Sequence, residues 1–386
     1  MIKIQATKLI KGVTFVNRTL RENLASPIVQ NIQFAVVKNK LYMKVTDLRT
    51  TLITYVNLPD YKGEEGLTFL MPGKALSSLL STMSSKDTQE QVEIKVGKDY
   101  SHSVKWSTGK QKLTGEDAKL FPKKTIIDKS KAISIDLNSQ DRDSFIKALQ
   151  YVLFACSTEE LKPSFTGVNL VGSDSNLLCI TSDGATFAMC PVILSDEQDS
   201  AAKISAIIPK DFMSTLVNAS EETDEAEHLF LSLTDRLIEI KLGTFVLTSS
   251  LIDSVVLPYQ GVINATEKYK LSFSFSRLEM LTALRRNLLT TSQLGYVTIE
   301  TFGETLEIRS SESDNNKETV SNVNLIEKGS IGYIAHFIGS RLLKILTNTA
   351  DEVLTVKYNS EREAVVIHGE NERAFMLLMP IDISKA

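Results

Sequence analysis

Two aspartates at corresponding positions of the chain could carry metal-dependent chemistry. Asp47 follows Thr46 and Asp183 follows Ser182, each at the end of a predicted strand. Paired carboxylates can hold the metal ions of a nuclease. Aspartate at such a position also accepts hydrogen bonds from the backbone of the turn that follows it. The turn role is favoured because both residues directly precede a turn. A metal-dependent nuclease is the weaker alternative, and a plasmid-nicking assay separates the two.

Cysteine and histidine form no catalytic or metal-binding pattern. Three cysteines, spaced by 23 and 11 residues, sit among apolar neighbours, and four histidines are scattered singly. Buried, unreactive thiols and surface or packing histidines are expected. The sequence contains no Gly-x-Ser-x-Gly, no phosphate loop, no His-Glu-x-x-His and no Cys-x-x-Cys. We therefore predict no metal, no cofactor and no enzymatic activity. The residues concerned are Cys156, Cys179, Cys190, His102, His228, His336 and His368.

Charge is separated along the chain, although the net charge of −4 argues at first against binding to nucleic acid. Residues 1–21 and the other five helical stretches defined below carry a summed charge of +10, so the remainder carries −14. Lysine and arginine are good helix formers on solvated faces, which accounts for any single basic helix. A bias in four of the six stretches instead favours contact between the helices and a polyanion.

The elements that position these residues follow a pattern written three times. Each copy has a helical stretch, then a hairpin-like apolar alternation, then a second helical stretch. Pro72 and Pro209 lie 137 residues apart, and Phe121-Pro122 recurs as Leu257-Pro258 after 136. A repeat of this size is a domain rather than a solenoid unit. The first stretches are 4–20, 139–156 and 276–291, the alternations 33–47, 167–183 and 295–309, and the second stretches 68–83, 205–220 and 332–349.

Within each copy, the periodicity predicts helices packed on a sheet. Helical spacing relates Phe145, Leu149, Val152 and Leu153 in the second copy, with Ser139 as the helix cap. The third copy has Leu278, Leu281, Leu284 and Leu288. Period-two segments such as 41–45 and 297–300 adjoin turn residues at 39–40 and 303–304. Each domain is predicted to be α+β, with two helices on one face of an antiparallel sheet.

Length and hydropathy set the wider frame. A chain of 386 residues is long enough for two to four domains, and the repeat makes three the expected number. No apolar run approaches the roughly 20 residues that cross a bilayer, and the first residues lack the apolar core of a secretory signal. We expect a cytoplasmic protein.

The sequence resembles the bacterial DNA polymerase III beta sliding clamps over essentially the whole chain. The resemblance rests on short segments in a matching order, none specific alone. They are Ser26-Pro27-Ile28, Thr46-Asp47-Leu48, Thr181-Ser182-Asp183-Gly184, Ser250-Leu251-Ile252-Asp253, Leu257-Pro258-Tyr259 and the terminal run Phe375-Met376-Leu377-Leu378-Met379-Pro380-Ile381.

The resemblance implies three clamp domains, residues 1–128, 129–264 and 265–386, and a head-to-tail homodimeric ring with helices lining the hole. Basic helices would then face the phosphates of duplex DNA without reading its sequence. A matched basic pair, Lys110 and Lys112, adds to the helical candidates. The predicted DNA-binding residues are Lys8, Lys11, Arg18, Arg21, Lys74, Lys110, Lys112, Arg285, Arg286, Arg341 and Lys344. Each, taken alone, could be a plain solvated cation.

The resemblance also implies a hydrophobic pocket between the second and third domains for short peptides of the replicative DNA polymerase, the clamp loader and other partners. A terminal β-strand is the structural alternative for residues 375–381. The matching pocket residues are Phe165, Ser182, Gly184, Phe187, Leu257, Pro258, Val262, Leu377, Leu378, Met379, Pro380 and Ile381. The matching dimer-interface residues are Leu113, Leu288 and Leu289, although Leu288 could be core.

Three departures from the family pattern adjoin this pocket. Ala185-Thr186 stands where the family usually has His-Arg, Gln260-Gly261 where two arginines are common, and Asp382-Ile383 where Arg-Leu ends the pattern. A different peptide preference is expected. The departures also keep open a clamp-like scaffold without a polymerase role. The mass of the native particle is the most informative single measurement. A value near twice 42.8 kDa supports a closed dimeric ring, whereas a monomer would leave the encirclement of DNA unexplained.

Overall fold

The fold is that of a computed structural model of the chain, which describes residues 1–17, 26–83, 90–159, 161–173, 175–196, 199–291, 295–312, 317–327 and 332–382. The residues form two compact units. The first is Met1–Arg142 with Thr215–Leu251, and the second is Asp143–Ser214 with Ile252–Ala386. Each unit is built on its own large antiparallel sheet.

The first unit contains an eight-stranded sheet in the order β5-β2-β3-β4-β16-β15-β14-β9. In β3, Leu41, Met43 and Val45 are fully buried, while Tyr42 and Lys44 between them are half-exposed, as the period of a strand requires. The strands are β2 (Asn31–Val37), β3 (Lys40–Thr46), β4 (Thr50–Asn57), β5 (Thr68–Pro72), β9 (Ile133–Leu137), β14 (Leu229–Leu233), β15 (Leu237–Leu242) and β16 (Phe245–Ser250).

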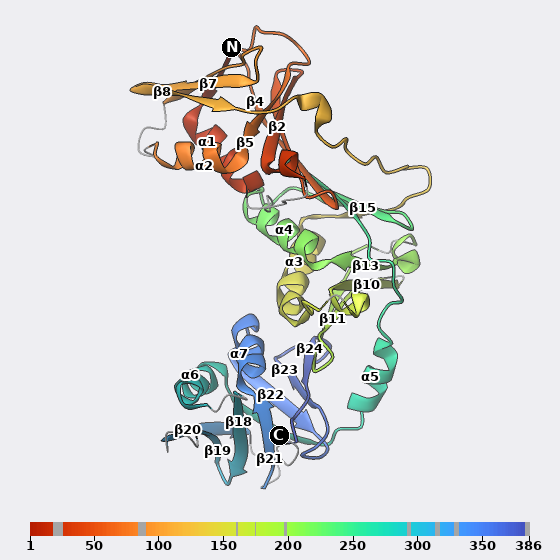
Figure 1. Ribbon diagram of the computed structural model, residues 1–386. Coiled ribbons are helices and arrows are strands. Elements are labelled where there is room, and N and C mark those ends of the chain that lie inside the picture. The colour runs from red at the N-terminus through yellow and green to blue at the C-terminus, as the bar shows by residue number, and fades with distance from the viewer. Residues whose placement is uncertain are drawn as a thin grey trace. The chain divides into compact units, whose positions relative to one another are not determined.

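A smaller sheet and two helices complete the first unit. The helices α1 (Ala6–Asn17) and α2 (Gly73–Ser81) lie side by side (Figure 1), and α1 packs on β3 and β4. A Cβ atom on Gly12 would lie 2.4 Å from Met43 Cε, so glycine lets α1 approach β3 closely. The small sheet is β1 (Ile2–Gln5), β6 (Gln91–Lys95), β7 (Ser101–Trp106) and β8 (Gly109–Thr114), and the 3₁₀ turns are η1 (Pro27–Gln30) and η2 (Ala118–Leu120).

The second unit contains a twelve-stranded sheet in the order β13-β10-β11-β12-β24-β23-β22-β17-β20-β19-β18-β21. The strand β24 pairs with β12 on one side and with β23 on the other, which brings residues 375–378 beside residues 186–189. The strands are β10 (Gly167–Ser173), β11 (Asn176–Ser182), β12 (Thr186–Ile193), β13 (Ser205–Pro209), β17 (Leu271–Ser276), β18 (Tyr296–Phe302), β19 (Thr305–Glu312), β20 (Lys317–Glu327), β21 (Ile334–Ile338), β22 (Val353–Tyr358), β23 (Val365–His368) and β24 (Phe375–Leu378).

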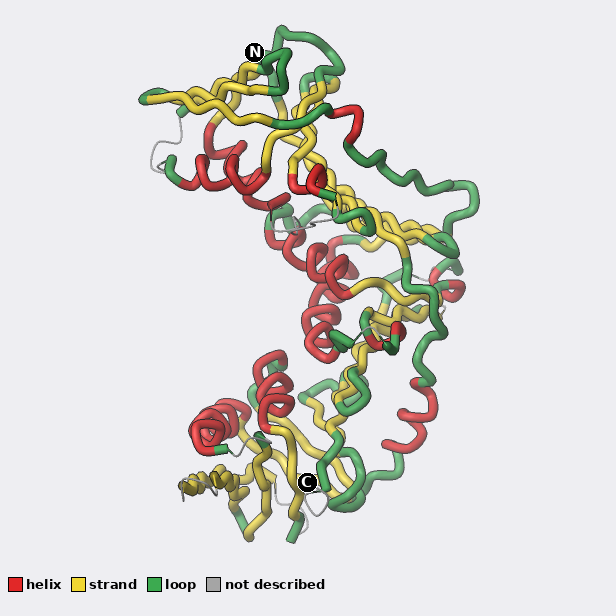
Figure 2. The backbone as a smooth tube through the Cα atoms, in the orientation of Figure 1, coloured by secondary structure: helices red, strands yellow, loops and turns green. Residues whose placement is uncertain are grey.

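Helices cover both faces of this second sheet. Helices α6 (Arg277–Asn287) and α7 (Gly339–Asn348) lie against each other on one face, and α5 (Tyr259–Thr266) packs on the other (Figure 2). The division between the two units falls within α3 (Ser139–Val152) and α4 (Lys210–Glu221). The 3₁₀ turns are η3 (Leu153–Ala155), η4 (Pro163–Phe165), η5 (Ala201–Lys203) and η6 (Leu288–Thr290).

The predicted α+β class and the three hairpins are confirmed, but each second helical stretch was predicted to start too early. The hairpins are β2–β3, β10–β11 and β18–β19. The first residues of 68–83 and 205–220 are the strands β5 and β13, and 332–349 contains β21 before its helix. These apolar runs pair with the first strand of each hairpin. They are therefore strands, because the hairpin supplies backbone hydrogen bonds to residues whose composition also suits a helix.

The first helical stretches also needed correction. Residues 4 and 5 belong to β1, so the first helix begins at Ala6, and residues 18–20 lie outside the described part of the chain. In α6, Leu278 is 58% exposed rather than buried. Met280, Leu281 and Leu284 instead face the sheet. At about 100° per residue, Leu278 lies about 110° from the centre of that buried stripe.

Helix α3 is capped by Asn138, and the prediction of Ser139 was wrong. The backbone N–H of Asp141 donates to Asn138 Oδ1 at 3.0 Å, and the N–H of Arg142 donates to the Asn138 carbonyl at 2.8 Å. Asn138 therefore supplies the side-chain oxygen that satisfies one of the free N–H groups at the helix start.

We expect the substitution Asn138→Ala to lower the free energy of unfolding by about 1 kcal/mol, because the cap is lost. The neighbouring substitution Ser139→Ala should change it by less than about 0.5 kcal/mol. Urea denaturation followed by circular dichroism measures both. A larger effect at Ser139 would contradict the assignment.

Candidate functional site

Asp47 and Asp183 each close their own turn. In both turns, the aspartate Oδ1 accepts hydrogen bonds from the N–H groups two and three residues later, at 2.9 and 2.6 Å. The glycine after Asp183 has φ +90°, a conformation that favours glycine. The prediction of turn capping is confirmed. Among the described residues, no three His, Cys, Asp or Glu side chains are grouped as ligands for a metal ion.

The cysteines are free thiols held in the neutral form. Burial raises the pKa of Cys156 to about 12 and of Cys190 to about 11, and it raises the pKa of the fully buried Cys179 well above its ordinary value. Because the thiolate is the reactive form, these thiols are poor nucleophiles at neutral pH. The prediction of unreactive thiols agrees with this environment.

Most of the predicted DNA-binding cations that the structure describes lie on helices, and both units contribute. Those described are exposed except for the half-buried Arg341. Lys110 and Lys112 are also exposed, but they lie on β8 rather than on a helix. Arg18 and Arg21 lie outside the described residues. The helical cations are Lys8 and Lys11 on α1, Lys74 on α2, Arg285 and Arg286 on α6, and Arg341 and Lys344 on α7.

Among the described candidates, Lys11 and Arg341 lie in ion pairs. Lys11 Nζ lies 2.9 Å from Glu222 Oε2, and Arg341 Nη2 lies 3.3 Å from Asp183 Oδ2. The second pair joins α7 to the turn after β11. The other carboxylate oxygen of Asp183, Oδ1, accepts the hydrogen bonds of that turn. Ion pairs at partly exposed positions contribute only about 0–1 kcal/mol, so a polyanion could compete for either cation.

A buried apolar cluster lies on one face of the second sheet at β12 and β24. We name it the β12–β24 surface. Val262 and Ile263 of α5 pack against it, and the rings of Phe187 and Phe375 stack at 6.0 Å between centroids. Its members come from β11, β12, β23 and β24 and alternate along each strand, so they share one face of the sheet. They are Ile180, Phe187, Met189, Val366, Phe375 and Leu377.

The structure brings four residues of the predicted peptide pocket together here. Phe187 and Leu377 belong to the β12–β24 surface, and Leu257 and Val262 pack against it. Met379 is 44% exposed at its edge, where its N–H donates to the Ala185 carbonyl at 2.9 Å. These residues offer a partly open apolar site at the start of β12.

Other predicted pocket residues have different roles. Leu378 is on the opposite face of β24, buried beside Phe275 and Leu342, so it does not line the β12–β24 surface. The Ser182 hydroxyl donates to the Thr186 carbonyl at 2.8 Å and so belongs to the turn. The remaining positions are at least partly exposed, and a Cβ on Gly184 would lie 3.7 Å from the ring of Phe165. These positions are Phe165, Gly184, Pro258, Pro380 and Ile381.

The predicted interface residues differ in accessibility. Leu289 is 86% exposed at η6, whereas Leu288 is half-buried and its Cδ2 would lie 2.5 Å from a Cβ on Gly339. Leu113 is 5% exposed, but it lies in β8, the outermost strand of the small sheet. Leu289 is thus free for contact, while Leu288 and Leu113 are committed to packing within the chain.

Sequence reasoning missed the residues that complete the surface. Met189 and Phe375 lie two positions from Phe187 and Leu377 on the same strands, and Ile180 and Val366 lie on adjoining strands. The period-two rule, applied outward from Phe187 and Leu377, points to the first two. Val366 could not be found this way, because its place depends on the pairing of β23 with β24.

Comparison with known proteins agrees with these features. The family described as DNA polymerase III beta subunit, central domain, matches residues 139–256. The beta sliding clamp of Bacillus subtilis is 24% identical over 62% of this chain and 61% of that protein. The beta sliding clamp of Pseudomonas putida KT2440 is 21% identical over 98% of both chains. The chain is thus similar in sequence to beta sliding clamps, in its central part and, at lower identity, along its whole length.

The fold of the chain is that of solved beta sliding clamps. It superposes on the DNA polymerase III beta subunit of Thermotoga maritima with a TM-score of 0.86, at 19% identity over 99% of both chains. For the sliding clamp of Bartonella birtlesii bound to griselimycin, the TM-score is 0.87, at 18% identity over 99% of both chains. None of the described helices is long and apolar enough to span a membrane.

Proposed function

We propose that the chain is a DNA sliding clamp that encircles duplex DNA and tethers the replicative polymerase to it. The observation that carries the proposal is the set of exposed cations on α1, α2, α6 and α7 of a beta clamp fold. Cations in this setting contact phosphates without reading bases, so the protein binds weakly while remaining free to slide. Retention on DNA then depends on topology.

The proposed assembly is a cytoplasmic homodimer closed head to tail. Each chain contributes three domains, residues 1–128, 129–264 and 265–386. The first domain of one subunit meets the third domain of the other, since a heterologous contact can close into a ring. The exposed Leu289 and the outermost strand β8 support this arrangement, because an apolar side chain and an unpaired strand edge both favour a partner.

The proposed partner site is the β12–β24 surface with Met379. It accepts short peptides of the polymerase, the clamp loader and other clamp-binding proteins. The chain has Ala185-Thr186 at its edge, so it supplies no cation at these two positions. The partly exposed residues beside the cluster, Leu257, Val262 and Met379, are apolar. Screening 20-residue peptides tiled along the polymerase of the same organism, by fluorescence anisotropy, tests the site. A bound peptide is then shortened from each end, and the shortest version that still binds is named the core peptide.

Topological retention is the direct test of the proposed function. Protein placed on circular DNA by the clamp loader should stay bound and leave when the circle is cut, because sliding ends at a free end. Gel filtration of labelled protein and DNA measures retention. Equal retention on linear DNA with open ends would contradict encirclement.

A matched pair of variants tests the helical cations. The double substitution Arg285→Ala and Arg286→Ala should weaken duplex binding of free protein and reduce its log–log salt slope by about 2, one per phosphate contact. The substitution Lys268→Ala removes an exposed cation after α5 and should leave the slope unchanged. If the salt slope fell equally in both variants, the effect would come from net charge alone and not from contacts made by the helical cations.

A further inference from the structure

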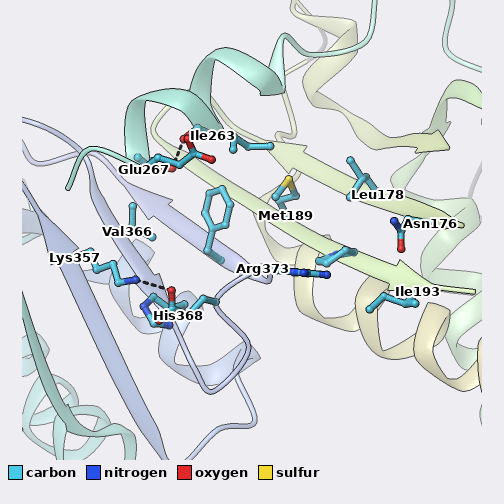
Figure 3. Close-up of a pocket in the computed structure, with 14 residues that line it drawn as sticks. Asn176, Leu178, Met189, Ile193, Ile263, Glu267, Lys357, Val366, His368 and Arg373 are labelled. Atoms are coloured by element: carbon cyan, nitrogen blue, oxygen red, sulfur yellow. Dashed lines mark hydrogen bonds and ion pairs between the residues drawn. The ribbon is translucent and has the colours of Figure 1, made fainter. Parts of the chain in front are cut away.

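A cavity of about 460 Å³ opens on the same sheet face as the β12–β24 surface. Figure 3 shows Leu178 and Met189 on one side, Val366 and His368 on the other, and Ile263 of α5 above them. The volume lies in the range of sites that hold small ligands or single side chains. None of the twelve residues predicted for the peptide pocket lines this cavity.

The cavity is continuous with the proposed peptide site. Phe187 faces Leu377 across the β12–β24 pair, and Met189 faces Phe375 in the next pair on that face. Two residues of strand span about 7 Å. Both pairs belong to the β12–β24 surface, and Met189 and Phe375 also line the cavity. A peptide extended along the strands therefore reaches the cavity within a few residues.

His368 lines this cavity and carries a buried hydrogen-bond acceptor that no described group uses. The residue is 5% exposed, and its Nδ1 lies 2.7 Å from the Gly369 carbonyl oxygen. A carbonyl accepts only, so Nδ1 carries the proton and Nε2 bears a lone pair. No described group bonds to Nε2. A buried acceptor without a partner is unfavourable, and a donor from a ligand would satisfy it.

The charges around the cavity balance. Lys357 Nζ lies 2.8 Å from Glu372 Oε2, and this hydrogen bond lowers the pKa of the Glu372 carboxyl. Glu267 and Arg373, both exposed, add one charge of each sign. A cavity lined by two cations and two anions favours a neutral occupant over an ion.

We propose that this cavity is a second docking position for the partner peptide. It takes one apolar side chain and one neutral N–H or O–H donor, from residues that flank the segment bound at Phe187, Val262 and Met379. The inference rests on the proposed peptide-binding function and adds to it a chemical requirement on the flanking residues. The apolar side chain packs on Met189 and Phe375, and the donor bonds to His368 Nε2.

The test compares the core peptide with versions lengthened at either end by Gly-Leu-Asn-Gly. One lengthened peptide should bind at least fivefold more tightly than the core peptide, because it adds an apolar side chain and an amide donor. A matched extension, Gly-Leu-Asp-Gly, has nearly the same shape but replaces the donor with an acceptor, and it should lose that gain. Fluorescence anisotropy with the full chain measures each dissociation constant.

Protein variants then locate the gain. The substitution His368→Asn keeps a donor for the Gly369 carbonyl but removes the Nε2 acceptor, so the gain should vanish. The substitution His368→Gln places an amide oxygen near the former Nε2 position and should restore part of it. The substitution Thr266→Trp fills the cavity from a half-exposed helix position without emptying the core, and it should also abolish the gain. The core peptide should bind all three within twofold of the native chain.

The outcomes separate the two proposals. If neither extension tightens binding, or if the gain survives Thr266→Trp and His368→Asn, the second docking position is wrong while the peptide site stands. If no tiled peptide binds, the proposed partner function fails and this inference fails with it. Should His368→Asn unfold, as circular dichroism would reveal, Thr266→Trp and the Asn/Asp peptide pair decide the matter.

Discussion

Replacing Leu289 by glutamate is expected to convert the proposed dimer into folded monomers. Leu289 is 86% exposed, so the charge costs the isolated chain little, whereas at a subunit interface it would be buried without a partner. The mass by light scattering should fall from twice 42.8 kDa to 42.8 kDa. Retention on circular DNA should be lost completely, because a monomer cannot close around the duplex.

A matched control is Ile126→Glu, which introduces the same charge at a residue 83% exposed. It should leave both mass and retention unchanged. Leu288 is unsuitable for the main test, since its close approach to Gly339 couples any substitution there to the packing of α6 on α7. Persistence of the dimer in Leu289→Glu would remove Leu289 from the interface.

Truncating Met379 to alanine is expected to weaken binding of the core peptide by roughly 30-fold. Apolar anchors in peptide sites contribute about 2 kcal/mol or more each, and 2 kcal/mol corresponds to about that factor in the dissociation constant. Met379 is 44% exposed, so its truncation leaves the fold intact. Phe187 is 8% exposed and stacks on Phe375, so truncation there would also destabilise the chain.

The matched control is Leu120→Ala, which removes an apolar side chain 70% exposed in the first unit and should not alter peptide affinity. The dimer and its retention on DNA should persist in both variants, which separates partner binding from ring closure. Undiminished peptide binding by Met379→Ala would leave the terminal segment with a purely structural role, as the strand β24 and its continuation.

Local patterns in the sequence were sufficient for the class of fold and for the turns. The alternation around Leu41, Met43 and Val45 predicts half-buried strands, and Asp47 and Asp183 close turns as expected. Both signals are short in range: a strand sets its side-chain period by itself, and an aspartate before a turn bonds to backbone two and three residues away. The threefold repeat likewise requires no knowledge of contacts.

Only the tertiary structure determined the features that depend on residues distant in the sequence. Residues 68–72 and 205–209 are strands because hairpins elsewhere in the chain supply their hydrogen bonds, although their composition also suits a helix. Leu377 and Leu378 are adjacent and alike, yet only the sheet determines which faces the β12–β24 surface. The open acceptor of His368 arises in the same way, since burial and satisfaction of a side chain are properties of the neighbours that folding brings to it.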